Sequence, residues 1–164
     1  MIPRIRVRLV AVLLLLLVLH FLLRPFLGDV RVAPDLLLLA LLAYAIQARP
    51  GHAAIAGFIV GLVADSLTPV AFGAGILAHT CVGYLAAWGK AVFFAESLPV
   101  SAGFFFVGSW LRDLLVLVAG GHMTEGTLFW QLAVWSPLKA LTTAAVGAVV
   151  LVLFRRWLDV RIRS

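Results

Sequence analysis

Residues 52–68 read HAAIAGFIVGLVADSLT, an apolar run that contains a single acidic side chain. Small residues recur in it every four positions, at Ala53, Gly57 and Gly61, and Asp65 continues the spacing. On a helix these positions drift by only about 40° per step, so they form one smooth groove into which a neighbouring helix backbone can pack. The pattern predicts a helix that packs closely inside a bundle. The groove serves packing alone, or it also positions Asp65 for a function.

The remainder of the chain is equally apolar, since 64% of its 164 residues are hydrophobic and only 12% are charged. A soluble domain of this length buries only about two-thirds of its chain surface, and the rest must be polar. This composition excludes a soluble globule and a disordered chain, and it indicates a protein whose solvent is lipid. Cys81 is the only cysteine, so the chain forms no internal disulfide.

The apolar run is one of a series. A hydrocarbon core about 30 Å thick takes about 20 helical residues, which leaves room for about six spans. The segments are continuous and leucine-rich, whereas barrel strands would alternate. We therefore expect an all-α integral membrane protein, a six-transmembrane-helix bundle that forms a single membrane domain over residues 1–164. The predicted spans are residues 7–23, 34–48, 52–68, 70–88, 98–119 and 128–154.

The last of these spans is long, at about 40 Å if it is fully helical, so it must tilt, bend or project from the membrane. Trp135-Ser136-Pro137 lies near its beginning. Proline inside a helix removes a hydrogen bond and crowds the preceding turn. We expect a kink at this point.

The net charge of +6 is a topology signal, because the charges gather in loops and at the chain ends. Cytoplasmic loops of membrane proteins carry an excess of Lys and Arg. This bias supports an even number of spans with both termini cytoplasmic, and it implies contact with anionic lipid and not with nucleic acid. With that topology the cytoplasmic side carries Arg4, Arg6, Arg8, Arg49, Lys90, Arg155, Arg156, Arg161 and Arg163, and the other side only Arg24 and Arg31.

A set of ionisable side chains lies inside the predicted spans: Asp65, His79, Arg112, Asp113 and Lys139. Such a group costs about 2.5–3.5 kcal/mol at the bilayer centre, so these side chains are expected to face inward and pair. In the topology above they lie at mid-depth or in the outward half of their helices. We expect an intramembrane polar cluster in which Asp65 pairs with Arg112 or Lys139 beneath a shallow outward-facing cavity.

Two helix faces are expected to meet at this cluster. Arg112 and Asp113 are adjacent and point about 100° apart, so they are not expected to neutralise each other on one face. A structural clamp, a ligand pocket and an ion path all remain open as roles for the cluster. One face carries Ser101, Gly108, Ser109, Arg112 and Asp113, and the other carries Gln131, Lys139, Thr142 and Thr143.

The sequence contains no catalytic or metal-binding motif. It has no Gly-x-Ser-x-Gly, no His-Glu-x-x-His, no phosphate-binding glycine loop and no cysteine pair. Ser109 and His79 could be imagined as a nucleophile and its base, but such side chains in a helical bundle more often form ordinary hydrogen bonds. We predict that the chain is not an enzyme and uses no cofactor and no metal.

Five short segments carry a family resemblance: PDLLLL at 34–39, RPG at 49–51, GFIVGLVADS at 57–66, FG at 72–73 and GYL at 83–85. The run Gly57-Phe58-x-x-Gly61-x-x-x-Asp65 is the most distinctive of them. Together with the length, span count and short loops, these segments resemble the rod shape-determining protein MreD family. The second half of the chain is similar to the family in layout only, so the resemblance gives no role to Arg112, Asp113 or Lys139.

The resemblance implies a non-catalytic, multi-pass protein of the bacterial cytoplasmic (inner) membrane that acts in the cell-wall elongation (rod shape) machinery. The partners it implies are an MreC-like protein, met through its membrane helix, and through it the RodA glycosyltransferase, a penicillin-binding transpeptidase and MreB filaments. Short loops leave helix faces as the contact surfaces. The family is also similar to the S components of energy-coupling-factor transporters, so the alternative function is a small-molecule-binding S component of a vitamin transporter. The almost unbroken Val and Leu of residues 10–19 counts against that alternative, because such subunits present small-residue faces on their first helix.

Overall fold

The structure is a computed structural model that describes residues 2–23, 26, 31–67, 72–93, 98–121 and 129–154. Its regular elements are all helices, so the all-α prediction is confirmed for this part of the chain. A π-helical turn, η3 (Gln131–Trp135), directly precedes the last helix. The α-helices are α1 (Ile2–Leu23), α2 (Leu36–Ala45), α3 (Pro50–Leu67), α4 (Ala74–Phe93), α5 (Leu98–Gly120) and α7 (Ser136–Phe154).

Three helical segments of the described chain are long and apolar enough to cross a membrane: Pro50–Leu67, Pro99–Gly120 and Gln131–Phe154. Val10–Leu23 and Leu36–Ala45 are shorter apolar helices. These lengths indicate a membrane protein. The ten residues of α2 rise about 15 Å, half the thickness of the hydrocarbon core, so the predicted span at 34–48 contains only a half-length helix. The count of six spans stays a prediction.

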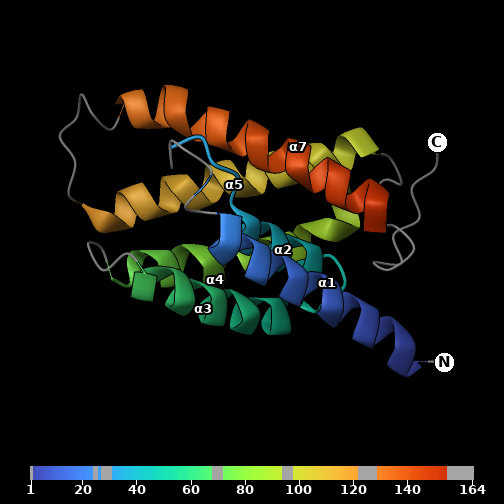
Figure 1. Cartoon of the computed structure of the whole chain (residues 1–164). Helices are drawn as coiled ribbons and strands as arrows, with labels where there is room; N and C mark the ends of the chain where they lie inside the picture. The colour runs from blue at the N-terminus through green and yellow to red at the C-terminus, as the bar shows by residue number, and fades with distance from the viewer. Residues whose placement is uncertain are drawn as a thin grey trace.

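The short helix α2 lies at the centre of the bundle (Figure 1), in contact with α1, α3, α4, α5 and α7. Nine of its ten residues are buried. Its sequence, LLLLALLAYA, is apolar on every side, as expected of a helix that other helices enclose. The leucine-rich segment 36–45 thus lies in the core of the bundle.

The longer helices surround α2 in pairs. α3 packs along α4, α5 packs along α7, and α4 also contacts α5. The first residues of α1 and the last residues of α7 lie at the same end of the bundle, and the last residues of α3 and α5 lie at the opposite end (Figure 1). The first and the last described helices therefore begin and end at the same end of the bundle.

The helix that carries Lys139 begins irregularly. The backbone amide of Ser136 donates to the carbonyl of Gln131, five residues earlier, which closes a π-helical turn. Pro137 follows at once; it has no amide hydrogen, and its ring crowds the carbonyl four residues before it. The irregularity therefore lies where the sequence predicts a kink, at Trp135-Ser136-Pro137.

Candidate functional site

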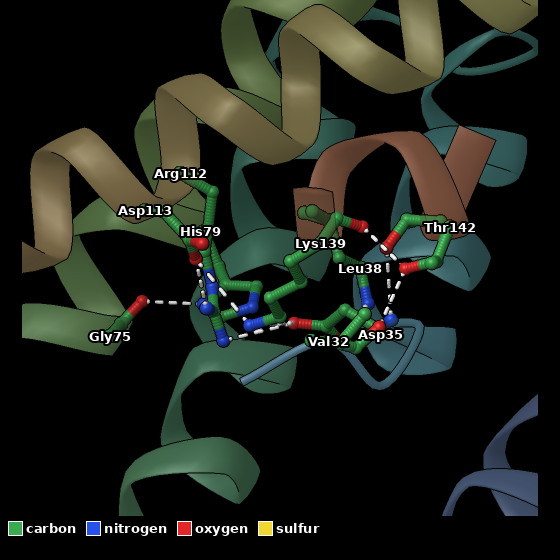
Figure 2. A network of polar contacts seen from close by, with 10 residues as sticks. Val32, Asp35, Leu38, Gly75, His79, Arg112, Asp113, Lys139 and Thr142 are labelled. Carbon is green, nitrogen blue, oxygen red and sulfur yellow. Dashed lines mark hydrogen bonds and ion pairs between the residues drawn. The ribbon is translucent and has the colours of Figure 1, made fainter. Parts of the chain in front are cut away.

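Four charged side chains meet where the beginning of α2 faces α5 and α7 (Figure 2). Arg112 Nη2 lies 3.0 Å from Asp35 Oδ2, and Arg112 Nη1 lies 2.6 Å from Asp113 Oδ1. Lys139 Nζ lies 3.5 Å from Asp113 Oδ1 and 3.9 Å from Asp35 Oδ2. Two cations and two carboxylates form a closed set whose formal charges cancel. We call Asp35, Arg112, Asp113 and Lys139 the ion network.

The ion network is shielded from its surroundings. Asp35 and Asp113 are buried, and the side chains of Arg112 and Lys139 are each only 18% exposed. A charge at this depth is costly unless it is paired and hydrogen-bonded. Because the four groups pair with one another, the free-energy cost of burying their charges in an apolar bundle is offset.

Asp35 also determines where α2 begins. Its Oδ1 accepts a hydrogen bond from the amide of Leu38 at 3.0 Å, so it caps the N-terminus of α2. Thr143 Oγ1 accepts a hydrogen bond from the amide of Asp35 at 3.1 Å, and Thr142 Oγ1 donates one to the carbonyl of Val32 at 2.7 Å. Non-helical backbone at membrane depth requires such partners from the protein. α7 thus supplies the hydrogen bonds that the irregular entry to α2 needs.

Asp65 is buried in the last turn of α3; the ion pairs of the network do not include it, although its charge interacts with that of Arg112. Its Oδ2 accepts hydrogen bonds from the amides of Gly73, at 2.7 Å, and Ile76, at 3.1 Å. The predicted pairing of Asp65 with Arg112 or Lys139 is wrong, because both cations form their ion pairs with other carboxylates. The unsatisfied amides at the beginning of α4 lie nearer to Asp65 and favour a negative charge there.

The expectation that Arg112 and Asp113 do not neutralise each other is also wrong, since they form the shortest ion pair of the network. Neighbouring side chains leave a helix in different directions, but the long Arg112 side chain turns back to reach Asp113. The predicted meeting of the two polar helix faces is confirmed, because Lys139 of α7 reaches Asp113 of α5.

His79 lies beside the ion network in α4 (Figure 2) and is completely buried. Its Nδ1 lies 2.7 Å from the carbonyl oxygen of Gly75, whereas its Nε2 has no hydrogen-bond partner in the structure. The same is true of Arg112 Nε in the network, and of Ser109 Oγ and Ser136 Oγ, which lie three residues before Arg112 and Lys139 in their helices. Buried polar atoms of this kind are typical sites of ordered water.

The small-residue positions of α3 lie against α4. A Cβ atom at Gly57 would overlap the carbonyl oxygen of His79, and one at Gly61 would lie 2.5 Å from the Cα of Ile76. Ala53 is fully buried on the same face. This close backbone approach is what brings the carboxylate of Asp65 to the first turn of α4.

Two cavities of contrasting character adjoin α5. The first, of about 450 Å³, is apolar and runs between α4 and α5; Leu85, Trp88, Phe104 and Val107 are among the residues that line it. The second, of about 260 Å³, adjoins the ion network and is lined by Arg31, Arg112, Asp113, Val116, Leu117, Gln131 and Lys139. We call the second one the polar cavity.

Asp35 belongs to the ion network but is not among the ionisable side chains that the sequence predicts for the cluster. It precedes a leucine run, and an acidic residue directly before an apolar segment is the signal of a helix N-cap. That signal was present in Pro34-Asp35-Leu36, but it does not reveal which cations lie opposite.

Among the described residues, no group of three His, Cys, Asp or Glu side chains is arranged to hold a metal ion. Neither the curated proteins nor the solved structures yield a match to the chain. The model of one protein family, described as rod shape-determining protein MreD, matches residues 4–160. This match confirms the resemblance seen in the sequence and covers nearly the whole chain, which belongs to the MreD family.

Proposed function

We propose that this chain is a non-catalytic membrane subunit of the bacterial cell-wall elongation machinery. The observation that carries the proposal is the family match over residues 4–160. The MreD family comprises shape-determining membrane proteins and is not a known enzyme family. The chain acts as a multi-pass protein of the cytoplasmic membrane, and its task is to organise other proteins within the plane of that membrane.

We propose an orientation with both termini in the cytoplasm. The beginning of α1 and the end of α7 lie at one end of the bundle (Figure 1), and the sequence places most basic residues at that end. The arginines of residues 155–164 lie outside the described residues, so their contribution is that of the sequence alone. In this orientation the ion network and the polar cavity face the outer leaflet. The likeness of the bundle to energy-coupling-factor S components stays a prediction.

The partner is met through helix faces. Large apolar side chains stand exposed on the outside of the bundle, among them Trp88, Val107, Val149 and Leu153. Apolar exposure alone marks a surface in contact with lipid, and packing of complementary helices can replace that lipid. An MreC-like protein with one membrane helix is the proposed direct partner; RodA, the penicillin-binding transpeptidase and MreB are reached through it.

The ion network serves as a clamp in this proposal. It joins the beginning of α2 to both α5 and α7, so it fixes the central helix against the two helices that pack beside it. Asp65 plays the matching part at the other helix pair, where it joins α3 to α4. The helix faces offered to partners are then held in one arrangement.

The test is depletion of the protein in a rod-shaped bacterial host, combined with affinity purification from its membranes. We expect loss of rod shape and co-purification of an MreC-like protein. A photo-crosslinking residue placed at Trp88 or Val107 reports contacts of the α4–α5 side, and one placed at Val149 or Leu153 reports contacts of α7. Normal cell width after depletion, with no partner recovered from any position, would contradict the proposal.

A further inference from the structure

We propose that a water molecule is bound between His79 of α4 and Arg112 of α5, and that it joins α4 to the ion network. The inference goes beyond the function proposed above, since the site lies inside the bundle and needs no partner protein. It is built on two buried nitrogen atoms of complementary chemistry, and on the route by which water reaches them.

The imidazole of His79 is held in one orientation and offers an acceptor. Its Nδ1 lies 2.7 Å from the carbonyl oxygen of Gly75, one turn earlier in α4. A carbonyl oxygen only accepts hydrogen bonds, so the proton of the neutral ring lies on Nδ1, and Nε2 is left as an acceptor. The side chain is completely buried, and Nε2 has no hydrogen-bond partner in the structure. A buried acceptor of this kind requires a donor.

Arg112 offers a donor that is fixed in the same way. Its Nη2 lies 3.0 Å from Asp35 Oδ2 and its Nη1 lies 2.6 Å from Asp113 Oδ1, so both ends of the guanidinium are engaged and its plane is held. The remaining N–H group, at Nε, is buried and has no hydrogen-bond partner. A guanidinium only donates. One donor and one acceptor therefore await partners on α5 and α4, two helices that pack against each other.

The two groups lie close together but do not bond to each other directly. Figure 2 shows the imidazole beside the guanidinium, and the charge of Arg112 acts on His79 more strongly than that of Asp35 or Asp65. A direct bond between the two nitrogen atoms would satisfy both, and neither is satisfied. A molecule that accepts from Nε and donates to Nε2 completes both groups at once. Water is the smallest molecule that does so.

The site is assigned to His79 and Arg112 because their planar groups cannot adjust. Ser109 Oγ and Ser136 Oγ also lack a hydrogen-bond partner in the structure. A serine hydroxyl, however, rotates freely and can turn to a backbone carbonyl one turn earlier in its helix. The imidazole and the guanidinium are each held by other bonds and have no such choice. Their two nitrogen atoms therefore define the position of the water.

Water reaches this position from the polar cavity. The cavity has a volume of about 260 Å³, far above the roughly 10–15 Å³ that one water molecule needs, and Arg112, Asp113 and Lys139 are among its lining residues. Arg112 belongs to both places, because it lines the cavity and lies beside His79 (Figure 2). A molecule from the cavity has only to pass the guanidinium to bind between the two helices.

The bound water completes a polar chain through the bundle. Asp65 of α3 accepts hydrogen bonds from amides at the beginning of α4, and His79 bonds to Gly75 in the same part of that helix. The water continues the chain from His79 to Arg112, whose partners lead to α2 and, through Asp113, to Lys139 of α7. The α3–α4 pair is thereby joined to the α5–α7 pair by polar contacts.

The experiment observes the His79 ring in the full chain. The protein is produced with isotope-labelled histidine and purified in detergent, and His20→Asn, His52→Asn and His122→Asn leave one histidine to observe. Long-range proton–nitrogen NMR spectra show which ring nitrogen carries the proton, and cross-relaxation between water and the ring protons reports a bound water. We expect a proton on Nδ1, a chemical shift of Nε2 typical of a hydrogen-bonded acceptor, and cross-relaxation with water.

Two variants separate the water site from the ion network. Arg112→Lys keeps a positive charge beside Asp35 and Asp113 but removes the Nε donor. Lys139→Arg is the matched control, since it makes the reverse exchange in the same network and leaves Arg112 Nε in place. We expect cross-relaxation with water to fall to the background level in Arg112→Lys and to stay within twofold of the parent protein in Lys139→Arg. If Arg112→Lys does not fold, the spectra of the parent protein decide.

Four results would overturn the proposal. A proton on Nε2 would remove the acceptor, and an absence of cross-relaxation with water would show that the site is dry. A coupling measured directly between Arg112 Nε–H and His79 Nε2 would show that the two groups bond without water. An equal loss of cross-relaxation in Arg112→Lys and Lys139→Arg would show that the water depends on the network as a whole and not on Arg112 Nε.

Discussion

α3 and α4 associate in a different way from α5 and α7. The first pair is joined by close backbone approach at Gly57 and Gly61. The second is joined by charged side chains that reach across, with Lys139 of α7 beside Asp113 of α5. In lipid the hydrophobic effect drives neither association, so packing and polar contacts must supply the free energy. The α3–α4 contact depends on the absence of side-chain atoms, and the α5–α7 contact depends on the balance of charge.

The largest loss of stability is expected from a substitution in the ion network, on which the charge-dependent contact rests. Asp35→Ala removes one carboxylate of the ion network and leaves Arg112 and Lys139 with Asp113 alone. An uncompensated buried charge typically costs about 3–5 kcal/mol in the free energy of unfolding. Thermal or denaturant unfolding in detergent micelles measures it.

Asp35→Asn is the matched control for this experiment. The amide has nearly the same size and still offers an oxygen to the amide of Leu38, so the cap of α2 is kept while the charge is lost. We expect it to be less destabilised than the Ala variant but clearly below the unsubstituted protein. A stability of Asp35→Asn equal to that of the unsubstituted protein would show that charge balance does not hold this contact.

The second-largest loss of stability is expected from a substitution in the packing-dependent α3–α4 contact. Gly57→Ala adds a methyl group where the His79 backbone carbonyl already lies, and backbone cannot move aside as a flexible side chain does. Overpacking of this kind costs about 1–3 kcal/mol. Gly51→Ala in the same helix is the control, because no atom lies within 4 Å of the added carbon. Equal stability of the two variants would remove the close-approach explanation.

A smaller effect is expected at the polar end of the α3–α4 contact. Asp65→Ala removes the acceptor of the Gly73 and Ile76 amides, and loss of a helix cap costs about 0.5–2 kcal/mol. Ser66→Ala serves as the control, since Ser66 is exposed and its hydroxyl donates to the carbonyl of Leu62 in its own helix. Hydrogen exchange at the beginning of α4 measures the local effect. If the two variants exchange alike, Asp65 does not fasten the two helices.

The smallest effect is expected in α5, at a glycine outside both contacts. Gly103 lines the apolar cavity between α4 and α5, and a Cβ atom there meets nothing within 4 Å. Gly103→Ala is therefore expected to stabilise the helix by up to about 1 kcal/mol through helix propensity. Gly108→Ala provides the comparison, because Leu42 Cδ1 would lie 2.9 Å from the new carbon. A loss of stability in the Gly103 variant equal to that in the Gly108 variant would contradict the open environment described for it.

The sequence predicts the helical class, the lipid environment and the meeting of the α5 and α7 polar faces, because each follows from composition or from spacing along one helix. The length of α2 does not follow in this way. Leucine occupies every face of α2, as it would in a full-length span, so hydropathy does not reveal that the helix is short. A ten-residue helix can fill the core because five other helices enclose it: α1, α3, α4, α5 and α7.

The partners of the charged groups were also beyond the sequence. The sequence predicts a cluster of Arg112, Asp113 and Lys139, which do meet, but it pairs Asp65 with the cations and does not indicate Asp35. Both carboxylates lie at helix ends beside apolar runs, so hydropathy does not distinguish them. The choice depends on which helix lies opposite which, and this is a property of the folded bundle and not of any one segment.

The π-helical turn has a consequence for the phase of the last helix. Its hydrogen bond from Ser136 to Gln131 encloses one residue more than an α-helical turn. Residues before the turn are therefore rotated by about 100° about the helix axis, compared with where a regular α-helix through Lys139 would place them. Gln131 reaches the same cavity as Lys139 only with this extra residue. A regular α-helix that kept every residue would carry Gln131 to a different side of the bundle, whereas a one-residue deletion within 132–135 would make the helix regular and leave Gln131 in phase with Lys139. The turn therefore works as a single-residue insertion that sets which side chains share the cavity, independently of which amino acids occupy it.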